Sequence, residues 1–361
     1  GDQATDALNE DAALHLYHNF SWMMEDVTAC NFSPNIIMNG KEPVEFSAFH
    51  LSIYEDSTCV DYPSISAVLE QYYAKKNEYT RIRQKSVDLR KIVSNTLERE
   101  RKKYELQKKQ LKDTEKREKY KVYGELLTTY GYQAKEGDKS LEAMNYYTNE
   151  MIKIPLDETL SPLENAKKYF NKYAKLKRTY QALTELTTET ETEIEHLESI
   201  ATSLDIATQE DDLSEIREEL VAYGYLRKKN GEKKKKSKSK PLHYVSSDGY
   251  HMYVGKNNYQ NDELTFKFAV GNDWWFHAKG MPGSHVIVKT NGDELPDATF
   301  EEAAKLAAYY SKGRENPKVE IDYLEKKNVK KPSGAAPGFV IYYTNYSMPI
   351  EPDITGITQI E

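Results

Sequence analysis

The stretch YHMYVGKNNYQNDELTFKFAVGNDWWFHAKGMPGSHVIV covers residues 250–288. It holds the highest concentration in this chain of residues that packing alone does not require. His251 and Tyr253 precede a turn at residues 255–258, and an aromatic run leads to a second turn at residues 282–285. Polar, aromatic and glycine residues that gather on turns are typical of a recognition surface, because loops carry contacts that rigid elements position. We therefore treat this stretch as the centre of a candidate site.

Short strands and helices alternate on both sides of the stretch. The residue patterns predict strands at 242–245, 251–254, 273–278, 285–290, 319–324 and 339–344, with helices at 259–269 and 298–312. Their short connections favour a compact α+β domain of about a hundred residues over 241–346. The tail at 347–361 is expected to be peripheral or to add one edge strand.

Two long helical patterns occupy residues 63–226, and each would extend roughly 60 to 80 Å. A four-residue step in the first seam shifts the apolar stripe without ending the helix. The first seam comprises Ile65, Val68, Tyr72, Tyr79, Ile82, Leu89, Val93, Leu97, Tyr104 and Leu111. The second alternates steps of four and three, as coiled coils do, through Tyr169, Tyr173, Leu176, Tyr180, Leu183, Thr187, Thr190, Ile194, Leu197, Ala201 and Leu204.

An insert at residues 120–155 separates the two seams. Residues 141–154 are rich in aromatic and β-branched side chains, which predicts a hairpin with Asn149 near its turn. Because both seams lie on one chain with a reversing insert between them, we expect an antiparallel coiled coil with a small tip rather than a parallel dimer. The tip either caps the helices or contacts a second site on a large partner.

The first segment, residues 1–62, does not have the pattern of a complete domain. A helix is predicted at 12–29 and a hairpin at 35–38 and 44–53, around the turn Asn39-Gly40-Lys41. A lone hairpin is marginal in water because it has no second layer to bury its apolar face. We expect a remnant of a larger N-terminal region, with exposed apolar residues around the hairpin.

A helix at 212–226 is followed by a basic linker, RKKNGEKKKKSKSK, at residues 227–240. Its nine basic residues and one Glu give about +8, and it has no apolar residue to bury, so it is expected to be disordered. Such a linker serves either solubility or salt-sensitive contacts with phosphates.

Composition limits the classes of function. The chain has 361 residues, a formal charge of -8 and two cysteines, Cys30 and Cys59. The acidic balance argues against indiscriminate coating of nucleic acid. The cysteine count excludes a disulfide framework and fits a reducing cytosol. No apolar run is long enough to span a bilayer and no signal peptide begins the sequence, so we expect a cytoplasmic protein without membrane contact, with a native N-terminus upstream.

The sequence does not predict an enzyme. Ser284 and His285 are neighbours on a strand and point to opposite faces, which prevents the hydrogen bond that a serine nucleophile needs. His251, His277 and His285 lack the spacing of a metal site, and no phosphate-binding glycine loop is present. We therefore expect no catalytic residue, metal or cofactor.

Four motifs carry a resemblance to a known family: VGKNNYQNDELT, WWFHAKGMPGSHVIV, EEAAKLAAYYSK and VKKPSGAAPGFV, in this order and spacing. They resemble the RNA-binding domain of the RqcH/NEMF (NFACT) family, which includes bacterial proteins called fibronectin-binding (FbpA type). VYGELL at 122–127 and ENAKKYFNKY at 164–173 are similar to the middle region of that family. The resemblance implies a multidomain chain, with a long antiparallel coiled coil and small α+β tip followed by a compact α+β NFACT RNA-binding domain. The family's N-terminal domain is not covered.

The resemblance also implies a function. The family acts in bacterial ribosome quality control: it binds the large ribosomal subunit obstructed by peptidyl-tRNA, recruits tRNA and supports template-free addition of alanine to the stalled chain. The acidic and arginine residues associated with tailing lie in the uncovered N-terminal domain, so this chain is expected to bind RNA without tailing. The expected location is the cytoplasm, on the ribosome.

The residues give partial support to RNA binding. Residues 241–361 hold twelve basic and sixteen acidic residues, so binding would depend on a local patch, shape and stacking. Side chains alternate along the aromatic run, so one of its faces is core and the other either stacks on a base or packs a second layer. Asparagines before the helix either cap it or contact RNA. The candidate RNA-binding residues are Lys256, Asn257, Asn258, Asn261, Trp275, His277, Lys279, His285, Lys326, Lys327, Lys330 and Lys331.

One departure from the family pattern concerns Lys256, which stands where we expect arginine. A lysine keeps the charge but loses bidentate phosphate geometry. Two alternatives to RNA binding remain: a cell-surface adhesin that binds fibronectin, and a structural spacer with an inert end domain. The sequence has no export signal, wall anchor or disordered repeat array to favour the adhesin.

Overall fold

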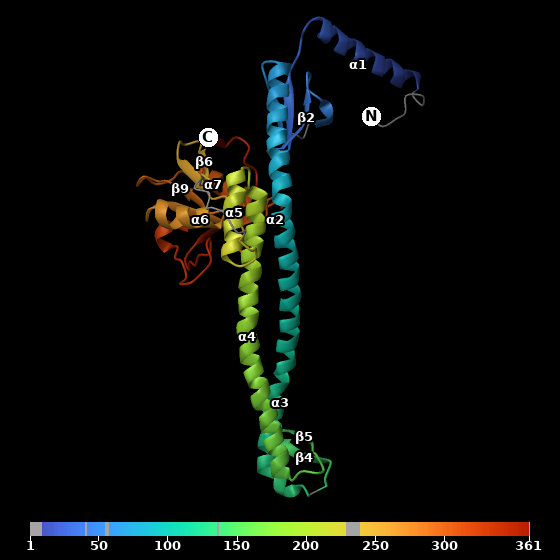
Figure 1. Cartoon of the computed structure of the whole chain (residues 1–361), viewed down its shortest axis with the longest axis vertical. Helices are drawn as coiled ribbons and strands as arrows, with labels where there is room; N and C mark the ends of the chain where they lie inside the picture. Colours follow the sequence, from blue (N-terminus) through green and yellow to red (C-terminus); the bar gives the residue numbers. More distant parts are fainter. Residues whose placement is uncertain (1–8, 40–41, 55–57, 136, 229–238, 361) are drawn as a thin grey trace. The chain divides into compact units, whose positions relative to one another are not determined.

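The computed structural model describes residues 9–39, 42–54, 58–135, 137–228 and 239–360 (Figure 1). The chain divides into two compact units, residues 1–87 and 88–361. Within the described ranges, no helix is both long and apolar enough to cross a membrane.

The first unit holds a helix and a small antiparallel sheet. Helix α1 (Glu10–Thr28) begins at Asn9, whose side chain accepts a hydrogen bond from the Ala12 backbone N–H. The sheet has the order β2 (Glu42–Ser47), β1 (Asn35–Asn39), β3 (Thr58–Asp61). The predicted hairpin is confirmed, but β2 ends at Ser47 rather than residue 53, and a 3₁₀ turn (Ser52–Tyr54) follows. Of its predicted turn, residues 40–41 lie outside the described residues.

The sheet packs on the start of α2 (Ile65–Asp113). Ile36 is buried against Val68 and Tyr72, and the Tyr72 hydroxyl donates a hydrogen bond to the Val44 carbonyl over 3.1 Å. Helix α1 has no buried residue, and large apolar side chains on it stay exposed. The predicted exposure of apolar residues around the hairpin is observed at Phe32, Val44 and Val60. The exposed apolar residues on α1 include Leu14, Leu16, Tyr17, Phe20 and Trp22.

Most positions of the predicted seams lie on covered stripes of two long helices, but Ile65, the first position of the first seam, is 39 % exposed. Both helices continue through the predicted steps, and α4 (Pro162–Ile206) begins with a capping box between Ser161 and Glu164. The α4 seam is half-buried or buried at every position from Tyr169 to Leu204. On α2, the buried seam residues are Val68, Tyr72, Ile82, Leu89, Val93 and Leu97.

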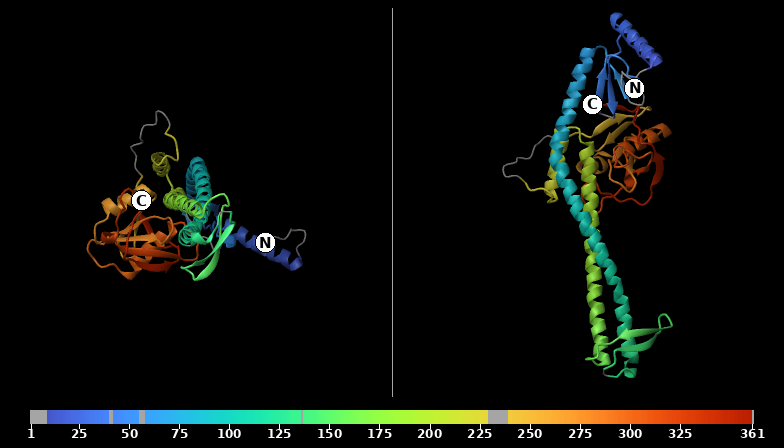
Figure 2. Two further views of the ribbon diagram at one scale, coloured as in Figure 1. Left: turned by 90° about the horizontal axis from the view of Figure 1, so that it is seen from below. Right: turned by 90° about the vertical axis from the view of Figure 1, so that its right-hand side faces the viewer.

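Helices α2 and α4 run antiparallel within the second unit (Figures 1 and 2). Arg101 pairs with Glu198, and further along α2 the Tyr104 hydroxyl donates to Glu191 over 2.9 Å. Because residue numbers rise on one helix as they fall on the other, the chain leaves along α2 and returns along α4, as predicted.

The reversing insert is a compact tip. Helix α3 (Arg117–Tyr130), between 3₁₀ turns at Thr114–Lys116 and Gly131–Gln133, packs Leu126 and Leu127 against the hairpin of β4 (Ser140–Asn145) and β5 (Glu150–Pro155). Asn149 lies in the hairpin turn with φ of 55°, in the left-handed region that Asn tolerates. The predicted hairpin is confirmed.

Helix α5 (Glu210–Ala222) follows α4 and matches the predicted helix at 212–226 with shifted ends. Asp212 caps it by accepting hydrogen bonds from the Thr208 and Gln209 backbone N–H groups, each over 2.9 Å. Most of the basic linker predicted at 227–240, namely residues 229–238, lies outside the described residues.

The C-terminal part is a seven-stranded antiparallel sheet with helices on both faces. Its order is β11 (Tyr346–Ile350), β10 (Val319–Glu325), β8 (Trp274–Ala278), β9 (Val286–Val288), β7 (His251–Val254), β6 (Leu242–Val245), β12 (Thr358–Ile360). Helix α7 (Asp297–Tyr309) buries its alanine-rich side on one face. Helix α6 (Asn258–Glu263) and the π-helix η5 (Leu264–Phe268) cover the other face.

Two predictions for this domain need correction. Residues 339–344 do not form a strand: Ile341 makes only an isolated bridge to Lys330, and a bend at residues 343–344 ends the extended backbone. The tail does more than add one edge strand, since β11 and β12 form the two opposite edges of the sheet.

Candidate nucleic-acid interface

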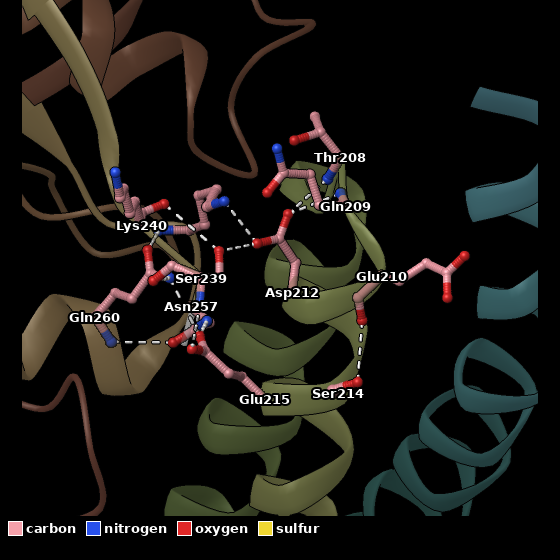
Figure 3. A network of polar contacts seen from close by, with 11 residues as sticks. Thr208, Gln209, Glu210, Asp212, Ser214, Glu215, Ser239, Lys240, Asn257 and Gln260 are labelled. Carbon is pink, nitrogen blue, oxygen red and sulfur yellow. Dashed lines mark hydrogen bonds and ion pairs between the residues drawn. The ribbon is translucent and has the colours of Figure 1, made fainter. Parts of the chain in front are cut away.

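The turn after β7 fastens this domain to α5. The Lys256 ammonium lies 2.6 Å from Asp212 Oδ1, and both side chains are almost fully buried. Asn257 caps α6 by accepting from the Gln260 backbone N–H over 3.0 Å. Its amide donates to Glu215 Oε2 over 2.6 Å (Figure 3). Both candidates therefore contact the helices and not the solvent.

The next two asparagines extend the same network. The Asn258 amide donates to Ser199 Oγ and to Glu219 Oε1, each over 2.8 Å. Asn261 accepts from the His285 backbone N–H over 3.0 Å. We call Lys256, Asn257, Asn258 and Asn261 the docking cluster. All four are at least 96 % buried, so an RNA strand cannot reach them without displacing the helices. Lys256, Asn257 and Asn258 hold the domain on the helices, and Asn261 holds the turn before β9.

Trp275 and two histidines lie in the layer under α6 and η5. Trp274 and Phe276 face α7 while Trp275 faces the other layer, so the predicted alternation and the second packed layer are confirmed. Trp275 has no exposed area and cannot stack on a base. His285 Nδ1 lies 2.7 Å from the Thr265 hydroxyl.

Burial also sets the charge of these histidines. It lowers the pKa of His277 to about 4, against weaker opposition from the Asp322 carboxylate. Burial and the nearby His277 place the pKa of His285 well below its usual range. Both imidazoles are therefore neutral at pH 7 and offer no positive charge to a phosphate.

The predicted lysines differ in how far their charge is available. Lys279 pairs with Glu320 over 2.9 Å and Lys327 with Glu325 over 2.6 Å, while Lys331 pairs with Asp262. Lys326 and Lys330 have no ion pair among the residues that the structure describes. The charges of Lys326 and Lys330 are therefore available to a ligand. Lys327 is on an exposed side chain and can exchange Glu325 for another partner.

Sequence reasoning missed two exposed residues beside these lysines. Tyr342 turns inward, where its hydroxyl donates to Asp322 over 2.8 Å, so the next residue, Tyr343, turns outward with 82 % of its area exposed. Lys267 on η5 is also exposed. The sequence shows the pair Tyr342-Tyr343, but it does not show which of the two rings faces solvent.

Backbone contacts hold these residues on one surface. The Lys326 and Lys327 backbone N–H groups donate to the carbonyls of Asp273 and Gly271, over 2.8 and 3.0 Å, in the loop after η5. Lys330 pairs through its backbone with Ile341, two residues before Tyr343. We call this set the lysine surface: Lys267, Lys326, Lys327, Lys330 and Tyr343. Lys326 is half-buried and the other four are exposed.

His251, His277 and His285, which were not expected to form a metal site, do not lie at one point. His251 Nδ1 lies 2.8 Å from His243 Nε2, whereas His277 and His285 contact each other with ring centroids 5.4 Å apart. In the described ranges, the group of three possible ligands that lie close together is His50, Cys59 and Asp61, all exposed. The thiol and the carboxylate contact opposite nitrogens of the His50 ring, so the arrangement is a hydrogen-bonded chain.

Comparison with known proteins identifies the family. Residues 1–239 match the NFACT N-terminal and middle domains, and residues 240–343 match the NFACT protein RNA binding domain. The chain belongs to the NFACT family. The resemblance drawn from the four motifs is thereby confirmed, and the docking cluster and the lysine surface both lie within the NFACT RNA-binding domain.

Several NFACT relatives are similar over most of this chain. The Rqc2 homolog RqcH of Streptococcus pneumoniae is 42% identical over 301 residues, which cover 83% of this chain and 54% of the relative. RqcH of Bacillus subtilis is 37% identical over 345 residues, covering 94% and 60%. The chain thus spans little more than half the length of these curated relatives.

A solved structure is also similar. It is the C-terminal part of the fibronectin/fibrinogen-binding protein from Streptococcus suis, which is 38% identical with a TM-score of 0.61. The match covers 76% of this chain and 96% of that one.

Proposed function

We propose that this chain is the RNA-binding part of a bacterial ribosome quality-control factor. In this proposal it acts in the cytoplasm on a large ribosomal subunit obstructed by peptidyl-tRNA, holds tRNA there, and so supports alanine tailing of the stalled chain by the whole protein. The main support for this proposal is the match of residues 240–343 to the NFACT RNA-binding domain, in a chain whose relatives are named RqcH. The chain needs no cofactor and catalyses no step itself.

The lysine surface is the part of the domain that we assign to RNA. Lys326, Lys327 and Lys330 would contact phosphates, which gives affinity that depends on salt and not on sequence. Tyr343 offers an exposed ring on which a base of an unpaired loop would stack. The docking cluster would hold this surface in a fixed orientation on α4 and α5.

The two long helices would act as an arm. With 45 residues at 1.5 Å per residue, α4 alone extends roughly 68 Å. We propose that α2 and α4 form an antiparallel coiled coil whose tip contacts a second site on the ribosomal subunit. The tip's exposed aromatic side chains, Tyr132, Tyr146 and Tyr147, are suited to such a contact.

Co-sedimentation tests this function. The chain is centrifuged with purified large ribosomal subunits that either carry peptidyl-tRNA or are vacant, at two salt concentrations. We expect more protein in the pellet with the obstructed subunits and less at higher salt, because phosphate contacts release counterions. Equal absence from both pellets would contradict the proposal.

The name of the Streptococcus suis structure favours one second candidate, binding of fibronectin. An immobilised-fibronectin assay with the same protein preparation separates the two. Capture of the chain by fibronectin, with no affinity for ribosomal subunits, would replace the ribosomal function with an adhesin.

A further inference from the structure

A second group of aromatic side chains lies on the sheet face that α7 covers, whereas Lys267 belongs to the layer on the other face. Trp274, Phe300, Tyr323 and Tyr346 line a pocket of about 550 Å³. The Trp274 and Phe300 rings meet edge to face with centroids 4.7 Å apart, and Tyr323 stacks on Tyr346 at 5.5 Å. Tyr346 keeps 64 % of its area exposed on the edge strand β11, so the rings are open to a ligand.

Every charged residue that lines this pocket is acidic. Asp297 and Glu301, one turn apart on α7, stand at its rim. Glu301 shares its charge with Lys305, 3.0 Å away, whereas Asp297 has no ion pair within the described part of the chain. The N-terminus of α7 contributes only about half a positive charge. The free Asp297 carboxylate therefore leaves the rim with a preference for a cation.

We propose that this aromatic pocket binds an arginine side chain of a partner protein. A guanidinium group is planar and weakly hydrated, so it stacks on the face of an indole or phenol ring and is attracted by the ring's electrons. Its N–H groups match a carboxylate such as Asp297 in a bidentate pair. Met348 and Ile350, which complete the wall, cover the aliphatic stem of the arginine.

Two other ligands fit less well. A lysine ammonium is compact and strongly hydrated, so it loses the stacking contact and the paired hydrogen bonds. A nucleobase would stack on the same rings, but its phosphates would approach Asp297 and Glu301. The pocket and the lysine surface thus have opposite charge, and the inference does not depend on RNA binding.

Fluorine NMR of the full chain labelled with 5-fluorotryptophan tests the proposal. The chain has three tryptophans, and Trp274→Phe identifies the signal of the pocket. The probes are a blocked nonapeptide of alternating arginine and glycine, the same peptide with uncharged citrulline, and an oligouridylate. We expect the arginine peptide to shift the Trp274 signal in a saturable way, at least tenfold more tightly than the citrulline peptide.

Variants at the rim make the test specific. Tyr346→Ala and Asp297→Asn are both at exposed positions, and each is expected to weaken the arginine peptide at least fivefold. Tyr17→Ala, an equally exposed tyrosine on α1 and outside the pocket, is the matched control and leaves binding unchanged. Equal binding of the citrulline peptide, a preference for the oligouridylate, or unchanged binding by Tyr346→Ala would each overturn the proposal.

Discussion

Single residues of the motif VGKNNYQNDELT show that the same side chains can serve RNA recognition or contacts within the protein. A lysine followed by asparagines is suited to phosphates and bases, and it is equally suited to joining a domain to an acidic helix. Asp212, Glu215 and Glu219 lie one turn apart on α5, and each accepts a contact from the docking cluster. The sequence contains both halves of this network, but their separation by more than 35 residues hides the pairing.

His277 makes stability depend on pH. Its folded pKa of about 4 lies below the unfolded value of about 6.5, so the unfolded chain binds more protons between these values. The contribution of neutral His277 to the unfolding free energy is fully present above the unfolded pKa of about 6.5, and it is lost as the pH falls from there towards 4. At about 1.4 kcal/mol per pH unit, lowering the pH from 7 to 5 costs about 2 kcal/mol through this residue.

The measurement is the urea-unfolding free energy at pH 7 and pH 5, for the wild type and for His277→Gln. The variant is expected to lose about 2 kcal/mol less than the wild type over this interval, because it removes the titrating group while the other histidines and carboxylates remain. The same loss in both proteins would show that His277 is not responsible.

The buried pair of Lys256 and Asp212 predicts a contrast between two lysines of one domain. Lys256→Met leaves the Asp212 carboxylate buried without its cation, which is expected to cost about 3 kcal/mol of unfolding free energy. Lys327→Met is the matched control: its ion pair with Glu325 is open to solvent on both sides, so little change is expected. Hydrogen exchange of Lys256→Met should show weaker protection in α5 and β7, and a loss confined to β7 would contradict docking on α5.

At the scale of elements, the periodicity of apolar residues predicted the features that neighbouring residues in the sequence determine, such as the buried side of a helix. The heptad steps marked the covered stripes of α2 and α4, and the reversing insert predicted their antiparallel course. The strand expected at 339–344 failed because side-chain alternation alone does not show where the backbone turns. The tail was expected to be peripheral or to add one edge strand, and it forms both edges, because the register of β11 and β12 depends on partners distant in the sequence.

The tip hairpin supplies a prediction at this scale. Asn149 has φ of 55°, where a Cβ without a compensating polar group is strained. Asn149→Ala is therefore expected to destabilise the hairpin by about 1 kcal/mol, whereas Asn149→Gly should be nearly neutral because glycine adopts this conformation freely. Amide exchange in residues 140–155 reports the difference, and equal protection of the two variants would argue against a left-handed turn.

For the whole molecule, the structure moves the candidate RNA contacts away from the buried residues between 256 and 285 and leaves them on the lysine segment. Sequence reasoning located the domain and its lysine segment, but it assigned buried residues and exposed residues to the same site. Burial separates them: Lys256 and Trp275 hold the fold, while Lys330 and Tyr343 face solvent. Burial arises from contacts between elements, so a single sequence does not reveal it.

The central claim is that the lysine surface binds RNA, and filter binding of labelled tRNA across a salt series tests it most directly. The charge-reversal variant combines Lys326→Glu, Lys327→Glu and Lys330→Glu. Its control applies the same change of charge to Lys91, Lys109 and Lys112, three exposed lysines on α2.

Each lost phosphate contact lowers the slope of log affinity against log salt by roughly 0.7 to 0.9. The account therefore predicts a slope about 2 to 3 smaller for the variant than for the wild type, with the control unchanged. Affinity without salt dependence in the wild type, or an equal loss in variant and control, would contradict it.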